Sequence, residues 1–140
     1  MVSKETAAEL VEHATQAREK AYARYSNYPV GAALLTKEGQ IFTGVNVENS
    51  VYPLTVCAER AALFTAVTEG YRSFEAIAVV TRDAGTPCGS CRQVLAEFGL
   101  DIEVIIADTK GEIQQITSVA ELLPFSFGPD NLDSSDWDAG

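Results

Sequence analysis

The sequence predicts an α/β fold in which helices pack on the faces of a mixed sheet of about five strands. Three observations predict it. Segments with helical periodicity alternate with short apolar segments, turns of four residues join two pairs of apolar segments, and helices separate the others. Short turns favour antiparallel pairs, whereas a helix between two strands is typical of a parallel crossover. At 140 residues, the chain has the length of one domain with a substantial core.

Residues 5–24 are predicted to form an amphipathic helix. Apolar residues recur there at helical spacing, namely Leu10, Ala14, Ala17 and Ala21. Thr6 and Glu9 have the spacing of a capping box, so we expect the helix to begin near Thr6. His13 falls on the polar face of this helix, where we expect it to be solvated.

A β-hairpin is predicted to follow. Pro29 biases the residues before it away from helix. The apolar segments 30–36 and 41–47 then flank a turn at residues 37–40, which is the pattern of two antiparallel strands. Residues 49–53 are predicted to form a loop because they contain Asn, Ser and Pro.

The middle of the chain is predicted to alternate helix and strand. Residues 55–69 are rich in alanine and helical in pattern, and Gly70 ends them. Residues 76–80 form a short apolar strand. The Thr-Pro pair at 86–87 opens a further helix, which Gly99 closes.

Two strands and a tail complete the predicted order. Residues 102–107 and 112–116 are expected to pair antiparallel, because a short turn joins them. We assign residues 1–129 to a single domain. We assign residues 130–140 to an acidic, flexible tail whose one apolar anchor is Trp137.

The charge of the chain bears on its partners. Ten basic and twenty acidic residues give a formal charge of −10. Nucleic-acid binders normally carry a basic patch, so this composition disfavours a nucleic-acid partner and favours a small neutral substrate. The N-terminus lacks the apolar core of a signal peptide, and no apolar run is long enough to cross a bilayer. We therefore expect a cytoplasmic protein without a membrane partner.

Two short segments, C-A-E and P-C-G-S-C, hold all the cysteines of the chain, Cys57, Cys88 and Cys91. An odd number of cysteines with a C-x-x-C pair indicates metal or redox chemistry and not a disulfide framework. Three thiolates can hold one zinc ion. A structural zinc takes four protein ligands, so three ligands leave a position for water, and Glu59 beside Cys57 supplies a carboxylate for proton transfer.

Both cysteine segments are predicted to lie at helix N-termini. Cys88 and Cys91 are three residues apart and share one helix face. Cys57 and Glu59 are two apart, so they converge on one ion only in a first helical turn, where Thr55 as N-cap would place them. The positive end of the helix dipole there lowers the pKa of a thiol and favours the thiolate.

Three thiolates around one divalent zinc leave a net negative charge, which opposes deprotonation of water. Arg60 lies three residues after Cys57 and is a candidate donor of hydrogen bonds to a thiolate sulfur, with Arg92 a weaker candidate. Without the neighbouring cysteines, Arg60 is equally well interpreted as a solvated helix residue.

Three other interpretations compete with a catalytic zinc. The cysteines can be small buried apolar residues, the C-x-x-C pair can be a thiol redox pair, and His13 can complete a closed structural zinc site. A redox pair requires neither Cys57 nor Glu59. The presence of both therefore favours water activation.

The segments T-V-C-A-E-R and P-C-G-S-C-R-Q resemble the zinc-dependent cytidine deaminases, whose pattern is [HC]-x-E followed by P-C-x-x-C. The similarity extends to Y-S-N-Y-P-V-G-A-A-L at 25–34, G-V-N-V-E-N at 44–49 and L-L-P-F-S-F-G-P at 122–129, which look like the small homotetrameric type. The resemblance implies a three-layer αβα sandwich with a mixed five-stranded sheet.

The resemblance also implies the chemistry. It places one zinc ion per chain on Cys57, Cys88 and Cys91, with Glu59 as the proton shuttle between water and the cytosine ring. Cytidine and 2′-deoxycytidine would then be hydrolysed to uridine and 2′-deoxyuridine plus ammonia, as in pyrimidine salvage. The expected partner is a nucleoside.

Substrate-binding residues follow from the same resemblance. Asn46 and Glu48 alternate onto one side of a strand end and would together satisfy a ribose hydroxyl, although turn-forming residues would show the same pattern. Tyr28 would line the sugar and base pocket. The chain departs from the family pattern in two places: phenylalanine is common at position 28, so the tyrosine hydroxyl needs a partner, and the loop 83–86 is short.

Further contacts are implied for the base and between subunits. Ala58 would contact the base through its backbone, while Tyr52 and Phe127 would reach the site of a neighbouring subunit in a homotetramer. Alternative hypotheses are a deaminase of an aminonucleoside antibiotic or of a polynucleotide, a thiol redox protein, and a zinc-stabilised binding module.

Overall fold

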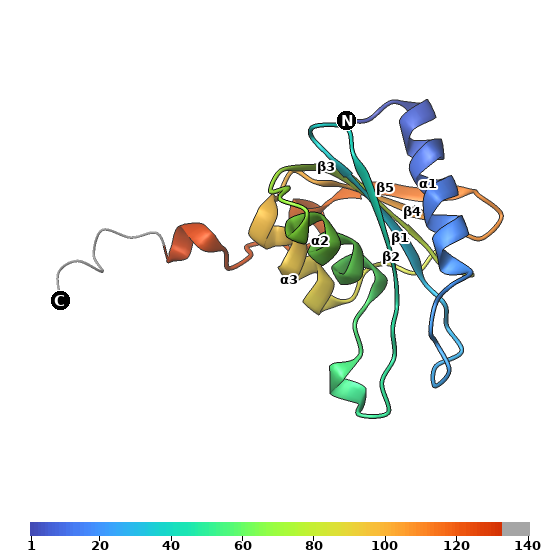
Figure 1. Cartoon of the computed structure of the whole chain (residues 1–140). Coiled ribbons are helices and arrows are strands. Elements are labelled where there is room, and N and C mark those ends of the chain that lie inside the picture. The colour runs from blue at the N-terminus through green and yellow to red at the C-terminus, as the bar shows by residue number, and fades with distance from the viewer. Residues whose placement is uncertain (133–140) are drawn as a thin grey trace.

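The structure, a computed structural model, describes residues 1–132, and its centre is a five-stranded mixed sheet in the order β2-β1-β3-β4-β5 (Figure 1). The strands are β1 (Gly31–Thr36), β2 (Ile41–Val45), β3 (Phe74–Val80), β4 (Glu103–Ala107) and β5 (Ile113–Ser118). β3 and β4 pair parallel, and every other neighbouring pair is antiparallel. The predicted mixed sheet and the antiparallel pairing of its last two strands are confirmed.

Helices cover both faces of this sheet, which gives three layers (Figure 1). α1 (Lys4–Arg18) packs on one face, while α2 (Ala58–Thr68) and α3 (Gly89–Phe98) pack on the other. A short helix, α4 (Val119–Leu122), and two 3₁₀ turns, Tyr52–Leu54 and Pro129–Asn131, complete the elements. The αβα sandwich is confirmed.

Alternation along the central strands builds a separate core on each face. In β3, Ile77 and Val79 face α2 and α3, whereas Ala76 and Ala78 face α1. The small side chains let α1 approach the sheet closely. A Cβ on Gly31 would lie 2.0 Å from the carbonyl oxygen of Ala14 in α1, so no side chain fits there.

The first helix is shorter than predicted and begins earlier. Ser3 is its N-cap, with Ser3 Oγ accepting a hydrogen bond from Thr6 N at 3.1 Å, so the predicted capping box at Thr6 and Glu9 is wrong. The helix ends at Arg18, although residues to 24 were included in the prediction. The chain leaves the helix because Tyr22 pairs with Val47 beyond the end of β2.

The two later helices begin at cysteines. Cys57 is the N-cap of α2 and Cys88 is the N-cap of α3. The prediction that Thr55 caps α2 is wrong, since Thr55 Oγ1 accepts instead from Asn49 N at 3.1 Å. The Thr-Pro pair at 86–87 likewise precedes α3 instead of opening it. The sequence segments that carry the thiols therefore stand at the helix ends themselves.

The described residues end in a 3₁₀ turn, in which Asn131 Oδ1 accepts from Gly128 N at 2.8 Å. The predicted tail thus begins inside this turn, while residues 133–140 and with them Trp137 lie outside the described part. The boundary at residue 129 stays a prediction. Between residues 1 and 132, no helix combines the length and the apolar character needed to cross a membrane.

Candidate active site and metal centre

The N-termini of α2 and α3 bring the three cysteines together. Cys57 Sγ lies 3.9 Å from Cys88 Sγ, Cys88 Sγ lies 3.4 Å from Cys91 Sγ, and all three sulfurs lie within 4.8 Å of one another. Zinc–sulfur bonds of about 2.3 Å in a tetrahedron place sulfurs about 3.8 Å apart. The thiol set therefore fits one zinc ion.

The group contains three ligands and not four. Among the His, Cys, Asp and Glu side chains of residues 1–132, only these cysteines form such a group. His13 lies on α1, across the sheet from the cysteines, and its Nε2 is 3.9 Å from Glu9 Oε1. A closed site completed by His13 is therefore excluded. A three-ligand group has the composition of a catalytic zinc site.

Glu59 stands beside this group in the first turn of α2. It is only 4% exposed. It lines a cavity of about 240 Å³ whose wall also includes Tyr28, Asn46, Cys57, Ala58 and Cys88. Burial raises the pKa of the Glu59 carboxyl, because the charged form loses its hydration. A carboxyl group in this state can both hold and release a proton.

The thiols have opposite pKa shifts. The pKa of Cys57 is lowered to about 5, because Cys91 shares its proton with the Cys57 sulfur and because Arg60 donates a hydrogen bond to it. The pKa of Cys91 is raised, since the hydrogen bond to Cys57 and burial both favour its protonated form. In the metal-free chain, Cys57 is thus the first thiolate to form. A zinc ion bound here would require the remaining thiols to lose their protons.

The two arginines near the cysteines differ in their contacts. Arg60 Nη2 lies 3.3 Å from Cys57 Sγ, which places a positive charge beside a thiolate. Arg92 Nε instead donates to Pro87 O at 2.8 Å, and Arg92 Nη1 donates to Leu122 O at 2.9 Å. Arg92 therefore holds the backbone before α3 and does not contact a sulfur.

Arg60→Gln is expected to raise the pKa of Cys57 in the zinc-free protein, because the variant loses the charge that stabilises the thiolate. The measurement is a pH titration of thiolate ultraviolet absorbance, in which the first midpoint of the unsubstituted chain is expected at pH about 5. Arg72→Gln is the matched control, since Arg72 bonds carbonyl groups at the other end of α2. Equal midpoints in all three proteins would contradict the role of Arg60 in stabilising the Cys57 thiolate.

The extended residues after β2 place Asn46 and Glu48 on its buried side. Asn46 Oδ1 accepts from Val30 N at 2.9 Å, and Asn46 Nδ2 donates to Tyr28 O at 3.0 Å. Asn46 lines the cavity that holds Cys57 and Glu59. Its amide thus ties that wall to the segment that contains Tyr28.

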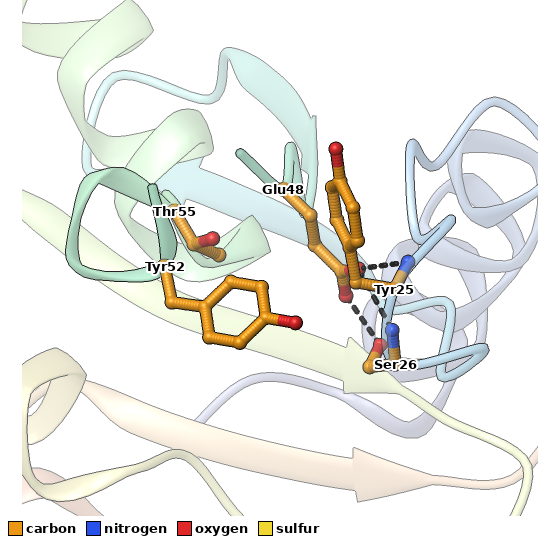
Figure 2. Close-up of a pocket in the computed structure, with 5 residues that line it drawn as sticks. All are labelled: Tyr25, Ser26, Glu48, Tyr52 and Thr55. Carbon is orange, nitrogen blue, oxygen red and sulfur yellow. Dashed lines mark hydrogen bonds between the residues drawn. The ribbon is translucent and has the colours of Figure 1, made fainter. Parts of the chain in front are cut away.

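Glu48 lines a neighbouring cavity of about 380 Å³, together with Tyr25, Ser26, Tyr52 and Thr55 (Figure 2). Glu48 Oε1 accepts from Tyr25 N at 2.9 Å and from Ser26 N at 3.0 Å. The hydroxyl of Ser26 donates to Glu48 Oε2, and this bond is the main reason that the pKa of Glu48 is lowered. Sequence reasoning missed Ser26 because no local spacing links it to Glu48.

Ala58, Tyr52 and Phe127 occupy different positions. Ala58 is fully buried at the start of α2. It lines the cavity of about 240 Å³ that Cys57, Glu59 and Cys88 also line, which we call the cysteine cavity. Tyr52 is 69% exposed and Phe127 is 59% exposed, and neither lines that cavity. The carbonyl of Phe127 accepts from Gln93 Nε2 at 2.8 Å. Within one chain, these two aromatic side chains therefore make no wall of the cysteine cavity.

The fold and the site together are those of a zinc hydrolase, with three thiols that could hold one metal ion and a buried acid beside them. Residues 4–107 match the family described as the cytidine and deoxycytidylate deaminase zinc-binding region. The chain belongs to this family.

Known proteins agree with this assignment. A cytidine deaminase from Sporosarcina psychrophila is 50% identical over 126 residues, which cover 88% of this chain and 92% of the relative. The crystal structure of a cytidine deaminase from Burkholderia pseudomallei superposes with a TM-score of 0.82 at 49% identity, covering 90% of this chain and 100% of that one. A blasticidin-S deaminase from Bacillus cereus is similar at 33% identity over 129 residues, covering 85% of this chain and 90% of that protein.

Proposed function

We propose that the chain hydrolyses cytidine and 2′-deoxycytidine to uridine and 2′-deoxyuridine plus ammonia, with zinc on Cys57, Cys88 and Cys91 and with Glu59 as the proton carrier. Hydrolytic deamination of cytidine is the reaction of the family. One observation carries the residue assignments: three sulfurs lie within 4.8 Å of one another, and the buried carboxyl of Glu59 lines one cavity with two of them, those of Cys57 and Cys88.

A zinc ion held by the three cysteines would supply a Lewis acid that lowers the pKa of water. The Glu59 carboxylate takes a proton from that water and delivers it to the ring nitrogen next to the amino-bearing carbon. A carbon–oxygen bond forms at this carbon. Glu59 then takes the proton of the newly added hydroxyl and delivers it to the amino group, so that the carbon–nitrogen bond breaks, a carbonyl forms at this carbon and ammonia leaves. Its raised pKa suits a group that is protonated in one step and ionised in the next.

The residues that line the cysteine cavity, together with Glu48 from the neighbouring cavity, orient the nucleoside. Ala58 offers its backbone to the base, Tyr28 packs against sugar and base, and Asn46 and Glu48 bind a ribose hydroxyl. The side chains of Asn46 and Glu48 already make hydrogen bonds within the chain, so they are held in fixed positions before a ligand binds. A fixed site loses less conformational entropy on binding.

The test is ammonia release from cytidine, measured together with the zinc content of the same preparation. We expect about one zinc per chain, as one three-ligand site requires, and cytidine turnover well above that of single-stranded DNA or RNA. The formal charge of −10 disfavours polynucleotides. A zinc-loaded protein that acts on blasticidin S but not on cytidine would favour the antibiotic. Full activity without metal would refute the proposed centre, and reversible oxidation of Cys88 and Cys91 without zinc would favour the redox protein.

We further propose a cytoplasmic homotetramer that serves pyrimidine salvage, in which Tyr52 and Phe127 reach the site of a neighbouring subunit. Both side chains are largely exposed and lie outside their own cysteine cavity, which supports a role across an interface. Val51 and Leu54 are also exposed beside Tyr52, so an apolar surface accompanies it.

Mixed tetramers test this arrangement. Phe127→Ala is expected to raise the KM for cytidine about tenfold, because an aromatic contact to the nucleoside is lost. Co-expression with Glu59→Gln chains should restore activity, since some sites then combine an intact Glu59 with an intact Phe127. Phe125→Ala, two residues away and fully exposed, is the matched control and should be unchanged. Activity of the mixture equal to the sum of the two separate variants would contradict a shared site.

A further inference from the structure

The hydroxyl of Tyr28 has a specific partner. Tyr28 Oη donates a hydrogen bond of 2.5 Å to Asp83 Oδ1, which also accepts from Thr81 Oγ1 at 3.3 Å. Burial and Asp83 raise the pKa of Tyr28, and the bond from Tyr28 lowers the pKa of Asp83. The pair is therefore a neutral phenol that donates to a carboxylate, which is stronger than a bond between neutral groups.

Two further contacts hold Tyr28 against the loop after β3 that contains Asp83. The guanidinium carbon of Arg82 lies 4.8 Å from the centre of the Tyr28 ring, and Arg82 Nη1 donates to Asn27 O at 3.0 Å. A Cβ on Gly85 would lie 2.5 Å from Tyr28 Oη, so a residue with a side chain would displace the hydroxyl. The loop thus encloses the hydroxyl end of Tyr28 and also faces its ring.

This loop is anchored to the sheet and leads into the metal ligands. Thr81 follows β3 and is 2% exposed, and its Oγ1 accepts from Gly85 N at 2.6 Å. Tyr28, Thr81 and Gly85 all line the cysteine cavity, whereas Asp83 does not. The two departures from the family pattern, Tyr28 and the short loop that begins at Asp83, are therefore in direct contact in this chain.

We propose that Asp83 is a positioning residue for substrate binding, which fixes Tyr28 as one wall of the cysteine cavity and makes it present its ring to the nucleoside. The hydroxyl is already bound to Asp83 and Arg82 lies over one face of the ring, so the other ring face is what remains for the ligand. This inference rests on the proposed function, because it requires the nucleoside to bind in this cavity.

A double-mutant cycle tests the role of Asp83. Asp83→Ala is expected to raise the KM for cytidine about fivefold and to leave kcat within about twofold, because a binding wall acts equally on bound substrate and transition state. In a Tyr28→Phe background the same substitution should have no further effect, since the hydrogen bond is already absent. Asp83→Asn keeps an acceptor oxygen and should recover most of the loss.

Matched controls separate positioning from folding. Asp108→Ala removes a carboxylate that accepts backbone hydrogen bonds in the turn after β4, away from the cavity, and should leave KM unchanged. Zinc content should be the same in all variants. Loss of zinc in Asp83→Ala, a fall in kcat at constant KM, or an equal effect of Asp83→Ala in both backgrounds would overturn the proposal.

Turnover of cytidine by the unsubstituted chain decides the proposed function separately. Calorimetry measures the affinity of the same variants for uridine, which binds without turnover. Asp83→Ala should weaken uridine binding about fivefold, but only when Tyr28 is present. An unsubstituted chain that does not bind uridine would also overturn the role of Asp83.

Discussion

Glu59→Gln is expected to lower kcat for cytidine by about three orders of magnitude or more while the chain keeps its zinc. The carboxamide has the size of the carboxyl but cannot carry a proton between water, ring nitrogen and amino group. The three sulfurs are untouched, so metal binding should be preserved. Because Glu59 is buried and its pKa is raised, replacement by a neutral group should not lower the thermal stability.

The measurements for this variant are kcat and KM for cytidine, zinc per chain and the thermal midpoint. Glu69→Gln is the matched control, since Glu69 caps the opposite end of the same helix and lies outside the cavity. It should retain normal kinetics. A Glu59→Gln protein that turns over cytidine at a near-normal rate would remove Glu59 from the role of proton carrier.

Cys57→Ala is expected to abolish stoichiometric zinc binding and, with it, activity. Two thiolates and water bind zinc far more weakly than three thiolates, and the lost one has the pKa of about 5 that provides the first thiolate. Cys57 is half-buried, so its truncation leaves less of a void than truncation of the buried Cys91. Folding is therefore expected to persist.

Metal analysis after treatment with a chelator, and the thermal midpoint before and after it, measure this prediction. Chelation should lower the midpoint of the unsubstituted chain, because a ligand bound to the folded state stabilises it. It should leave that of Cys57→Ala unchanged. Ser90→Ala, an exposed position between Cys88 and Cys91, is the control and should bind zinc normally. One zinc per chain in Cys57→Ala would refute the proposed ligand set.

The three longer helices and the five strands were accessible from periodicity, but the short helix α4 and several element boundaries were not. The apolar spacing of α1 continues to Ala21, yet the helix ends at Arg18, because Tyr22 pairs with Val47 and takes the chain out of the helix. That pairing joins residues far apart in the sequence, so it cannot be predicted from local spacing. The predicted N-cap of α2 was wrong for a similar reason. Thr55 is a residue type that often caps helices, but its hydroxyl accepts a hydrogen bond from Asn49 N instead.

The sequence by itself determined the sheet, the helices between its strands and the residue types of the candidate metal centre. These features depend on local spacing: period-two and helical apolar patterns, short turns, and thiols three residues apart with a carboxyl two residues from another thiol. Residue types at fixed separations define which atoms can converge at the start of a helix.

Tertiary structure decided which distant groups meet. It brought the starts of α2 and α3 together, paired Ser26 with Glu48, and placed Tyr28 against Asp83. These contacts follow from how the helices and loops pack around the sheet. Packing energy is summed over many side chains across the core, so no short segment specifies the partner that each of these groups will have.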